Sequence, residues 1–368
     1  MKYTTLIFCV LGTLCANSQL KVTASSLAGY ETNIYKSPSM LISDGEVLNE
    51  SELFASSAYQ DLILNSTYSK KWTNSLFKVS LNPQLRYYFS QENAKTSIVN
   101  ARVKYAYNFS RTTKWENSLS YKVKSQNGQD LDANELSTPL GYNRWNFSSR
   151  FLMRFSKRNR SVFEFNYGNK TFDASESRQV AYNFYGLNFT TRKVKWKNGL
   201  LHSFGLNVAY SGREYNIQNI EEETNSKRNW DYINTSVFYK IPFNKKWNIE
   251  PQLEYEKRMD KTNNQFGYDE FSTSFKLKFK SKSFLFNLTP NFAYRAFDKL
   301  NTTGTTIQKL NYKYVRLNMN TSYKLNKKWM LTSRAYLISR NSNNNNINTT
   351  AYRSYHNNYF GLGLKFIF

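Results

Sequence analysis

The stretch VNARVKYAYNF, residues 99–109, alternates between two kinds of side chain. Apolar and aromatic residues occupy the odd positions, whereas Arg102, Lys104 and other polar residues fill most of the even ones. A period of two sustained over about ten residues is the pattern of a β-strand with one apolar face, and no helix produces it. Strands of soluble sheets average about 5–6 residues. The stretch therefore predicts a strand long enough to cross a membrane at a tilt.

The same alternation recurs along the chain, at residues 77–89, 145–155, 271–279 and 354–368. A short basic turn, often ending in Trp, punctuates these segments and returns roughly every 36 to 50 residues. The turns lie at residues 69–72, 111–115, 157–160, 192–196, 244–247, 280–282 and 326–329. Each interval holds two alternating segments separated by a longer polar stretch, such as residues 126–142, 214–229, 259–268, 298–309 and 341–350. Tight turns at one end and longer loops at the other are the layout of an outer-membrane barrel.

The number of segments predicts an all-β, transmembrane, antiparallel up-and-down barrel of about sixteen strands. The turns join fourteen strands, and residues 354–368 supply a fifteenth. Both termini can lie in the periplasm only if the number is even, and residues 20–35 can supply the first strand. Sixteen is therefore favoured over fourteen or eighteen. Residues 19–368 form one barrel in this interpretation, with no plug and no soluble domain.

The first eighteen residues have the layout of a secretory signal peptide. Lys2 is the charged start, residues 6–14 are a short apolar core, and Ala16-Asn17-Ser18 is a small-x-small cleavage site. The apolar run is shorter than the roughly 20 residues that a spanning helix needs. We therefore expect residues 1–18 to be removed and the protein to reach the bacterial outer membrane. Lipidation at Cys15 is disfavoured, because such a site usually needs a small residue directly before the cysteine and Leu14 stands there.

Composition and charge favour a membrane barrel over a nucleic-acid-binding protein. The chain has 28 Tyr and 27 Phe but 14 Gly and 6 Pro, a balance that suits a barrel showing aromatics to lipid. The net charge of +25 would otherwise suggest nucleic-acid binding. Such binding needs aromatics and cations on one face, whereas here they alternate between opposite faces. We therefore expect lipid and glycolipid as partners, and no nucleic acid.

If the aromatic face meets lipid, the opposite face lines the interior and is strongly basic. Rings of Arg and Lys are typical of anion and phosphate pores, so this face predicts binding of a passing anion. Mixed polar residues that merely hydrate a wide barrel are the alternative interpretation. The candidate lumen-lining residues are Arg86, Arg102, Lys104, Lys122, Arg144, Arg150, Arg154, Lys276, Lys278, Arg295, Arg316 and Arg334. Some are expected to pair with a row of acids that contains Glu250.

Catalysis and metal binding are not expected. Both cysteines, Cys9 and Cys15, fall in the signal segment, and the only histidines are His202 and His356. By strand parity both histidines face lipid, where neither can serve a catalytic triad at the lumen. A chain with so little Cys and His also has no cluster for a metal. No cofactor is expected.

Two groups of aromatic residues have expected roles in the membrane. Trp72, Trp115, Trp196, Trp247 and Trp329 lie at or beside the short turns, where an interfacial girdle would form. The terminal strand ends with Phe366 and Phe368 on its aromatic face. This ending resembles the C-terminal signal that the outer-membrane assembly machinery reads, which implies that this machinery is a partner.

The segment Gly29–Ser39, followed by Ser43-Asp44, resembles the first strand and loop of porin-like barrels linked to exopolysaccharide export. A similar Tyr-x-x-Asn start occurs in the barrels of surface-lipoprotein assembly modifiers. The wealth of Lys, Asn, Tyr and Phe is similar to that of barrels from Bacteroidota, which are Gram-negative. TonB-dependent receptors are disfavoured, because they need a plug and about 22 strands.

Two hypotheses of function follow. The first is a porin-like conduit for anionic or polar solutes, or for an exported anionic polysaccharide. The second is a structural or scaffolding barrel that docks a periplasmic or surface partner and conducts little. A continuous bore with unpaired arginines would favour the first, and a sealed lumen with salt-bridged charges would favour the second.

Overall fold

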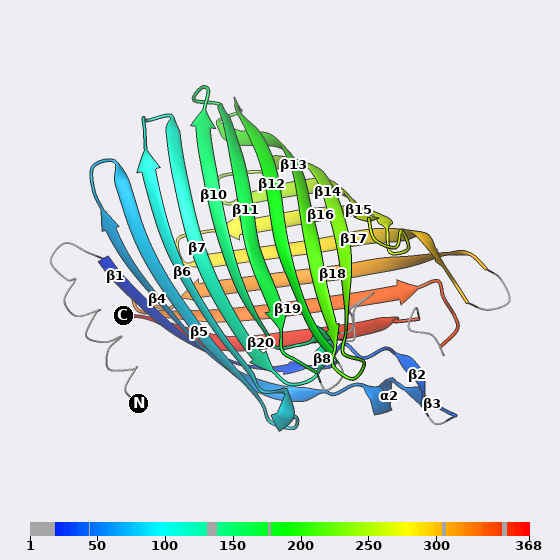
Figure 1. Cartoon of the computed structure of the whole chain (residues 1–368). Coiled ribbons are helices and arrows are strands. Elements are labelled where there is room, and N and C mark those ends of the chain that lie inside the picture. Colours follow the sequence, from blue (N-terminus) through cyan, green and yellow to red (C-terminus); the bar gives the residue numbers. More distant parts are fainter. Residues whose placement is uncertain (1–18, 44, 131–137, 176–177, 304–306, 348–351) are drawn as a thin grey trace.

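The computed structural model describes residues 19–43, 45–130, 138–175, 178–303, 307–347 and 352–368. The expected signal peptide, residues 1–18, lies outside the described residues. The described chain is one closed β-barrel with small additions in its loops (Figure 1).

Sixteen strands form the barrel, as the sequence predicts. They are β1 (Gln19–Glu31), β4 (Ser57–Lys71), β5 (Ser75–Tyr88), β6 (Thr96–Asn108), β7 (Thr113–Gln126), β10 (Tyr142–Arg154), β11 (Asn159–Phe172), β12 (Arg178–Lys197), β13 (Leu200–Asn219), β14 (Thr224–Pro242), β15 (Trp247–Asp260), β16 (Tyr268–Lys280), β17 (Phe284–Asn301), β18 (Lys309–Lys324), β19 (Trp329–Ser342) and β20 (Tyr355–Ile367). Each strand pairs antiparallel with its neighbour along the barrel chain, and β1 closes the sheet against β20 from Thr23↔Ile367 to Glu31↔Tyr359. No helix among the described residues is long and apolar enough to span a membrane.

The two ends of the barrel differ. Short turns such as residues 72–74, 198–199 and 281–283 occupy one end, here called the turn end. Both termini of the barrel chain lie there, since the Ile367 N–H donates to the Lys328 carbonyl at 2.8 Å (Figure 1). The other end, the loop end, carries the small elements β2 (Met40–Ser43), β3 (Glu46–Asn49), α2 (Glu50–Leu53), η1 (Glu92–Ala94), β8 (Gln129–Asp130) and β9 (Thr138–Pro139).

One expected loop is mostly strand. Residues 214–229 continue β13 and β14 as a paired ladder that ends in a turn at residues 220–223. The reason is a change of phase: Tyr215 and Ile217 point inward and pack with Val180 and Trp230. Apolar residues have moved to the register that is polar in the rest of the strand, so the alternation used to find strands breaks there.

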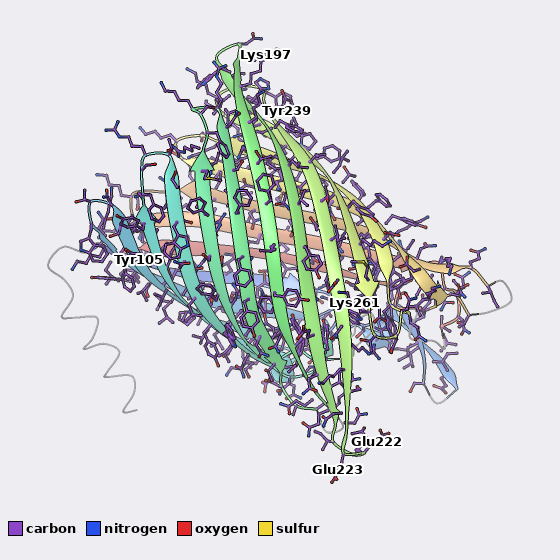
Figure 2. All side chains as sticks on the ribbon, turned by 45° about the horizontal axis from the view of Figure 1, so that its top comes forward. Tyr105, Lys197, Glu222, Glu223, Tyr239 and Lys261 are labelled. Carbon is purple, nitrogen blue, oxygen red and sulfur yellow. The ribbon has the colours of Figure 1, made fainter. Side chains whose placement is uncertain are left out.

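The outward face of the barrel is apolar and aromatic over most of its height. Tyr105 and Tyr239 lie on this surface, and Lys197 and Glu222 mark the opposite ends of the barrel (Figure 2). Outward side chains such as Phe151, Phe163 and Leu364 are between 37% and 46% exposed. This matches the expected assignment of the aromatic face.

The outward face becomes polar near the loop end. The outward Tyr210 hydroxyl donates to Asp231 at 2.7 Å, and the outward Tyr255 hydroxyl donates to Asp269 at 2.5 Å. Lys261, in the loop after β15, forms a hydrogen bond and an ion pair with Asp231 that raise the pKa of the lysine. Tyrosines that are apolar on one side and hydrogen-bonded on the other are typical of a membrane–water boundary. The strands therefore project beyond the apolar band at this end.

The inside–outside assignment predicts unequal effects of substitution on neighbouring residues of β16. Phe275→Arg should lower the free energy of unfolding by about 2–4 kcal/mol, because it places a charge on the lipid face. Lys276→Gln should cost less than about 1 kcal/mol, since its ion pair with Glu250 is partly exposed. Reversible urea unfolding in lipid vesicles measures both. Equal costs would show that the two faces are wrongly assigned.

Candidate functional site in the barrel interior

The twelve candidate cations share the inward register, but their contacts differ. Five pair with carboxylates: Arg86 with Asp61 and Glu31, Lys104 with Glu116, Arg150 with Glu164, Lys276 with Glu250, and Arg295 with Glu270. The expected pairing of Glu250 across the sheet is thus present, with 3.5 Å between its Oε1 and Lys276 Nζ. Cations held in this way are largely neutralised.

The remaining candidates keep their charge uncompensated. Four of them bind neutral groups: Arg102 donates to Ser118, Lys122 lies over Tyr142, Arg144 over Phe184, and Arg316 over Tyr314. Arg154, Lys278 and Arg334 form no ion pair, side-chain hydrogen bond or cation–ring contact among the described residues. These three are exposed to the space inside the barrel, and two of them lie within a few residues of the turn end.

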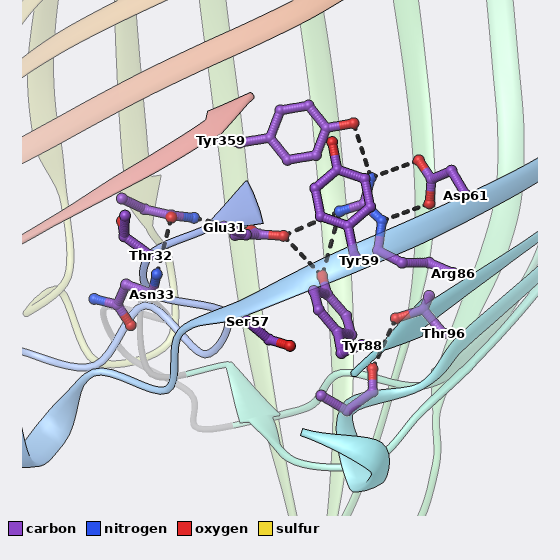
Figure 3. A network of polar contacts seen from close by, with 12 residues as sticks. Glu31, Thr32, Asn33, Ser57, Tyr59, Asp61, Arg86, Tyr88, Thr96 and Tyr359 are labelled. Carbon is purple, nitrogen blue, oxygen red and sulfur yellow. Dashed lines mark hydrogen bonds and ion pairs between the residues drawn. The ribbon is translucent and has the colours of Figure 1, made fainter. Parts of the chain in front are cut away.

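Arg86 is the centre of a network at the seam of the barrel (Figure 3). Its guanidinium donates two hydrogen bonds to Asp61, at 2.6 and 2.8 Å, and one to Glu31 at 3.0 Å. It also lies 4.5 Å from the ring centroid of Tyr59 and 4.8 Å from that of Tyr359. The Asp61 side chain is fully buried. The network joins β20, β1, β4 and β5, and its contacts hold Arg86 in the wall of the barrel.

Glycines make room for the Tyr59 ring at the same seam. Gly29 pairs with Gly361 on β20 and with Tyr59 on β4. The Tyr59 hydroxyl donates to the Phe360 carbonyl at 3.0 Å, so the ring lies across the junction of β1 and β20. A Cβ atom on Gly361 would meet that hydroxyl at 2.3 Å. An aromatic side chain covering strand glycines restores packing that the glycines themselves lack.

Aromatic and cationic side chains form a continuous inner lining at the loop end, here called the aromatic–cation belt. Each member contacts the next, with ring or cation-to-ring separations from 4.3 to 6.3 Å. It runs through Lys122, Tyr142, Phe172, Tyr182, Tyr215, Trp230, Arg258, Tyr268, Phe297, Tyr312, Arg340 and Tyr355, one residue from each strand from β7 to β20 that belongs to the barrel.

The belt is a packed part of the barrel wall, because most of its side chains are buried from solvent. Trp230, Tyr268 and Tyr312 are each 3% exposed or less. Its arginines also hold the loops, since Arg258 donates to the Phe266 carbonyl and Arg340 to the Arg353 carbonyl. The alternation rule assigns aromatic residues to the lipid face throughout, so it does not predict the belt. The signal was present where Tyr312 and Tyr314 occupy the same register as Arg316.

A separate basic pocket lies near the turn end. It has a volume of about 320 Å³ and is lined by Arg192, Lys240, Lys276 and Lys278 around the carboxylate of Glu250. Arg192 and Lys240 were not among the candidate residues. The sequence pattern assigns Arg192 to a turn, but β12 continues to Lys197. The Arg192 side chain therefore points inward, where it donates to Ser203 at 2.5 Å.

The two histidines lie in the outward register, as expected. His202 contacts the outward Tyr239 hydroxyl at 3.2 Å, and His356 lies 3.4 Å from Glu50 and edge-on to Phe54. Within the described part of the chain, no group of three or more His, Cys, Asp or Glu residues could hold a metal ion.

The aromatics assigned to the membrane interface lie near the turn end. Trp247 packs against Phe279 and Trp329 against Phe366, both in the outward register. Trp72 and Trp115 are outward as well. Trp196 differs, since it shares the register of Arg192 at the end of a long hairpin and is 62% exposed. Phe368 packs edge-on against Phe366, with 4.7 Å between the ring centroids.

The closed strand order, the strand lengths and the apolar outward face together define a transmembrane β-barrel. No family model and no curated protein matches the chain.

Solved structures with a similar course of the chain include several outer-membrane proteins. The alcaligin receptor FauA from Bordetella pertussis is 9% identical, with a TM-score of 0.46 over 94% of this chain and 76% of that one. The channel DcaP of Acinetobacter baumannii is 10% identical (TM-score 0.45, 96% and 98% covered), and so is a bacterial polysaccharide outer-membrane secretin (0.45, 94% and 98%). Because these TM-scores lie below 0.5, the strand pairing of this chain, and not the likeness, establishes the barrel.

The network around Arg86 predicts a large cost when only its cation is removed. Arg86→Met should lower the free energy of unfolding by about 3–5 kcal/mol, because it leaves buried Asp61 without its partner. Arg86→Met combined with Asp61→Leu should recover much of that loss. Arg334→Met is the control and should change stability little. Urea unfolding in vesicles measures all four proteins, and a double variant no more stable than Arg86→Met would contradict the pairing.

The seam predicts a steric effect of one methyl group. Gly29→Ala would bring a Cβ to 2.0 Å from the Phe360 carbonyl oxygen, so it should cost about 1–3 kcal/mol of stability. Gly186→Ala is the matched control, because its Cβ would meet nothing closer than 3.3 Å. The midpoint of thermal unfolding should fall for Gly29→Ala alone. Equal midpoints in the two variants would refute close packing at the seam.

Proposed function

We propose that this protein is a porin-like, non-catalytic conduit of the bacterial outer membrane that favours anionic or polar solutes. The turn end and both termini face the periplasm in this proposal, and the loop end faces outward. A sixteen-stranded barrel is wide enough to leave an aqueous channel. The observation that carries the proposal is the surplus of inward cations: Arg154, Lys278 and Arg334 form no ion pair, side-chain hydrogen bond or cation–ring contact among the described residues.

Uncompensated inward cations lower the electrostatic barrier to anions and raise it for cations. The carboxylates of the interior are largely committed to ion pairs, for example Glu116 with Lys104 and Lys114. They therefore offset few of the remaining positive charges. The basic turns add further positive charge at the proposed periplasmic mouth, which would steer anions toward it.

The segment Gly29–Ser39 resembles exopolysaccharide-export barrels, and the composition of the chain is similar to that of Bacteroidota barrels. We therefore extend the proposal to an exported anionic polysaccharide as the solute. Lipid and glycolipid would surround the aromatic face, with the tryptophans beside the turns at the interface. The assembly machinery would recognise the terminal strand through Phe366 and Phe368.

A scaffolding barrel that conducts little is the second candidate. The observation that favours it is the packing of the loop end, where the aromatic–cation belt is buried and the loops bind one another. The Ser39 N–H on the β1–β4 loop donates to the Ser354 carbonyl on the β19–β20 loop at 2.7 Å, and Thr303 binds Asn344 between the β17–β18 and β19–β20 loops. Such ordered loops suit a docking surface for a partner.

Single-channel recording in planar bilayers tests the conduit. In a potassium chloride gradient the refolded protein should show a reversal potential of the sign expected for anion selectivity. Arg334→Gln should move that potential toward zero. Lys313→Gln, on the outward face of the neighbouring strand β18, removes the same charge and should leave it unchanged.

Two results would contradict the conduit. Cation selectivity would show that the inward cations do not set permeation. Absence of any conductance from protein with a normal barrel spectrum in circular dichroism would favour the scaffolding barrel.

A further inference from the structure

The basic pocket near the turn end gathers four cations around one acid. Four cationic side chains from β12, β14 and β16 surround one carboxylate, that of Glu250 on β15. Glu250 lies 3.5 Å from Lys276 Nζ and 4.0 Å from Arg192 Nη2. At the ion-paired cluster of Glu116 and Glu164, three cations (Lys104, Lys114 and Arg150) meet two carboxylates, whereas in this pocket four cations meet one.

Two of the four cations, Lys240 and Lys278, form no ion pair and no side-chain hydrogen bond among the described residues. The register on either side places Lys240 opposite Glu250, and Lys278 pairs across the sheet with Asn248 and Asn287, both uncharged. Four like charges so close together repel one another, and a single carboxylate offsets only part of that repulsion. A bound multivalent anion would offset the rest.

The ladders beside the pocket lack pairs next to two prolines. Between β14 and β15 the pairing lapses at Lys240 and Glu250, beside Pro251, and between β16 and β17 it lapses at Lys276, near Pro290, with the same register on both sides of each gap. Proline has no backbone N–H to donate to a ladder. The gaps therefore fall at three of the residues that line the pocket.

From this geometry we propose that the pocket of Arg192, Lys240, Lys276 and Lys278 is a binding site for a phosphoryl group. A phosphate monoester carries close to two negative charges at neutral pH and offers three acceptor oxygens. The guanidinium of Arg192 suits two of these oxygens, and the lysine ammoniums serve as mobile point charges for the others. A carboxylate or chloride, with one charge, would leave most of the surplus in place. The pocket volume lies within the range of small-molecule sites.

A site of this kind would make phosphorylated solutes the class that the proposed conduit carries. The proposal depends on the conduit function only because the conduit provides the route by which a solute reaches the site. Its position near the turn end places it within reach of the basic turns at residues 243–246 and 281–283. Free phosphate and the phosphoryl group of a larger solute share this chemistry. The experiment therefore uses both sources.

Isothermal titration calorimetry of the refolded protein in a maltoside detergent measures the site without any conductance. Sodium phosphate and a sugar monophosphate are titrated in turn at constant ionic strength, with sodium chloride as the reference. Both phosphates should bind, and chloride should not. Tighter binding of the sugar phosphate would identify the phosphoryl group of a larger solute as the ligand, and tighter binding of phosphate would identify the free anion.

Three variants locate the site. Lys240→Gln and Lys278→Gln should each weaken phosphate binding about fivefold or more, since each removes one cation at contact distance. Glu250→Gln should strengthen binding, because it removes the competing carboxylate. Lys78→Gln is the matched control: it removes an inward lysine near the turn end of β5, on another part of the wall, and should leave the affinity unchanged. Thermal unfolding confirms that each variant is folded.

Several outcomes would overturn the site. They are no phosphate binding by the folded wild type, equal weakening in Lys78→Gln, or weaker binding in Glu250→Gln. Anion selectivity in planar bilayers would survive each of these, so a failed site would leave the conduit standing. Phosphate binding together with cation selectivity would overturn the conduit and keep the site.

Discussion

Pairing of the first strand with the last is the interaction on which the whole molecule depends. In lipid, an unpaired backbone N–H or carbonyl costs several kcal/mol, so a sheet survives there only when it has no edge. β1 meets β20 from Thr23 to Glu31, a shorter ladder than most others in the barrel. The side chains inside this seam compensate, with the Tyr59 ring lying over Gly29 and Gly361 and Arg86 tying together residues of four strands. This buried polar network therefore stabilises closure.

Closure then divides the interior into two regions of different chemistry. Near the loop end, the strands extend beyond the apolar outward band, and an inner aromatic core becomes possible because the wall has water on its outside. Tyr312 and Trp230 are buried there, and Arg258 and Arg340 hold loops in place. Near the turn end, the inner face keeps charged groups such as Arg154 and Lys278 accessible to the lumen. In the proposed conduit, the cations near the turn end would favour anions, and the packed loop end would hold the loops in order.

The sequence predicts the barrel well because a period of two is a direct consequence of strand geometry. The odd-numbered residues from Val99 to Phe109 and from Phe271 to Phe279 lie in the outward register, and the short turns give the correct number of strands. The rule fails where its physical premise fails. At Tyr215, Trp230 and Tyr312 the outer face no longer meets lipid, so aromatic residues move inside. Contacts across several strands, such as those of Arg86 with Glu31 and Tyr359, depend on strand order and register, which alternation alone does not specify. Alternation does not predict the pocket near Glu250 for the same reason, because the pocket brings together Arg192 and Lys240 from different strands.

The central claim is that alternate side chains of one strand meet lipid and water, and spin-label accessibility measures this most directly. A nitroxide would be placed in turn at each position from Phe271 to Lys278 of β16 in protein reconstituted in vesicles. Collisions with dissolved oxygen should peak at Phe271, Thr273, Phe275 and Leu277, and collisions with a water-soluble nickel complex should peak at the positions between them. A profile without the period of two, or with the two phases exchanged, would contradict the account.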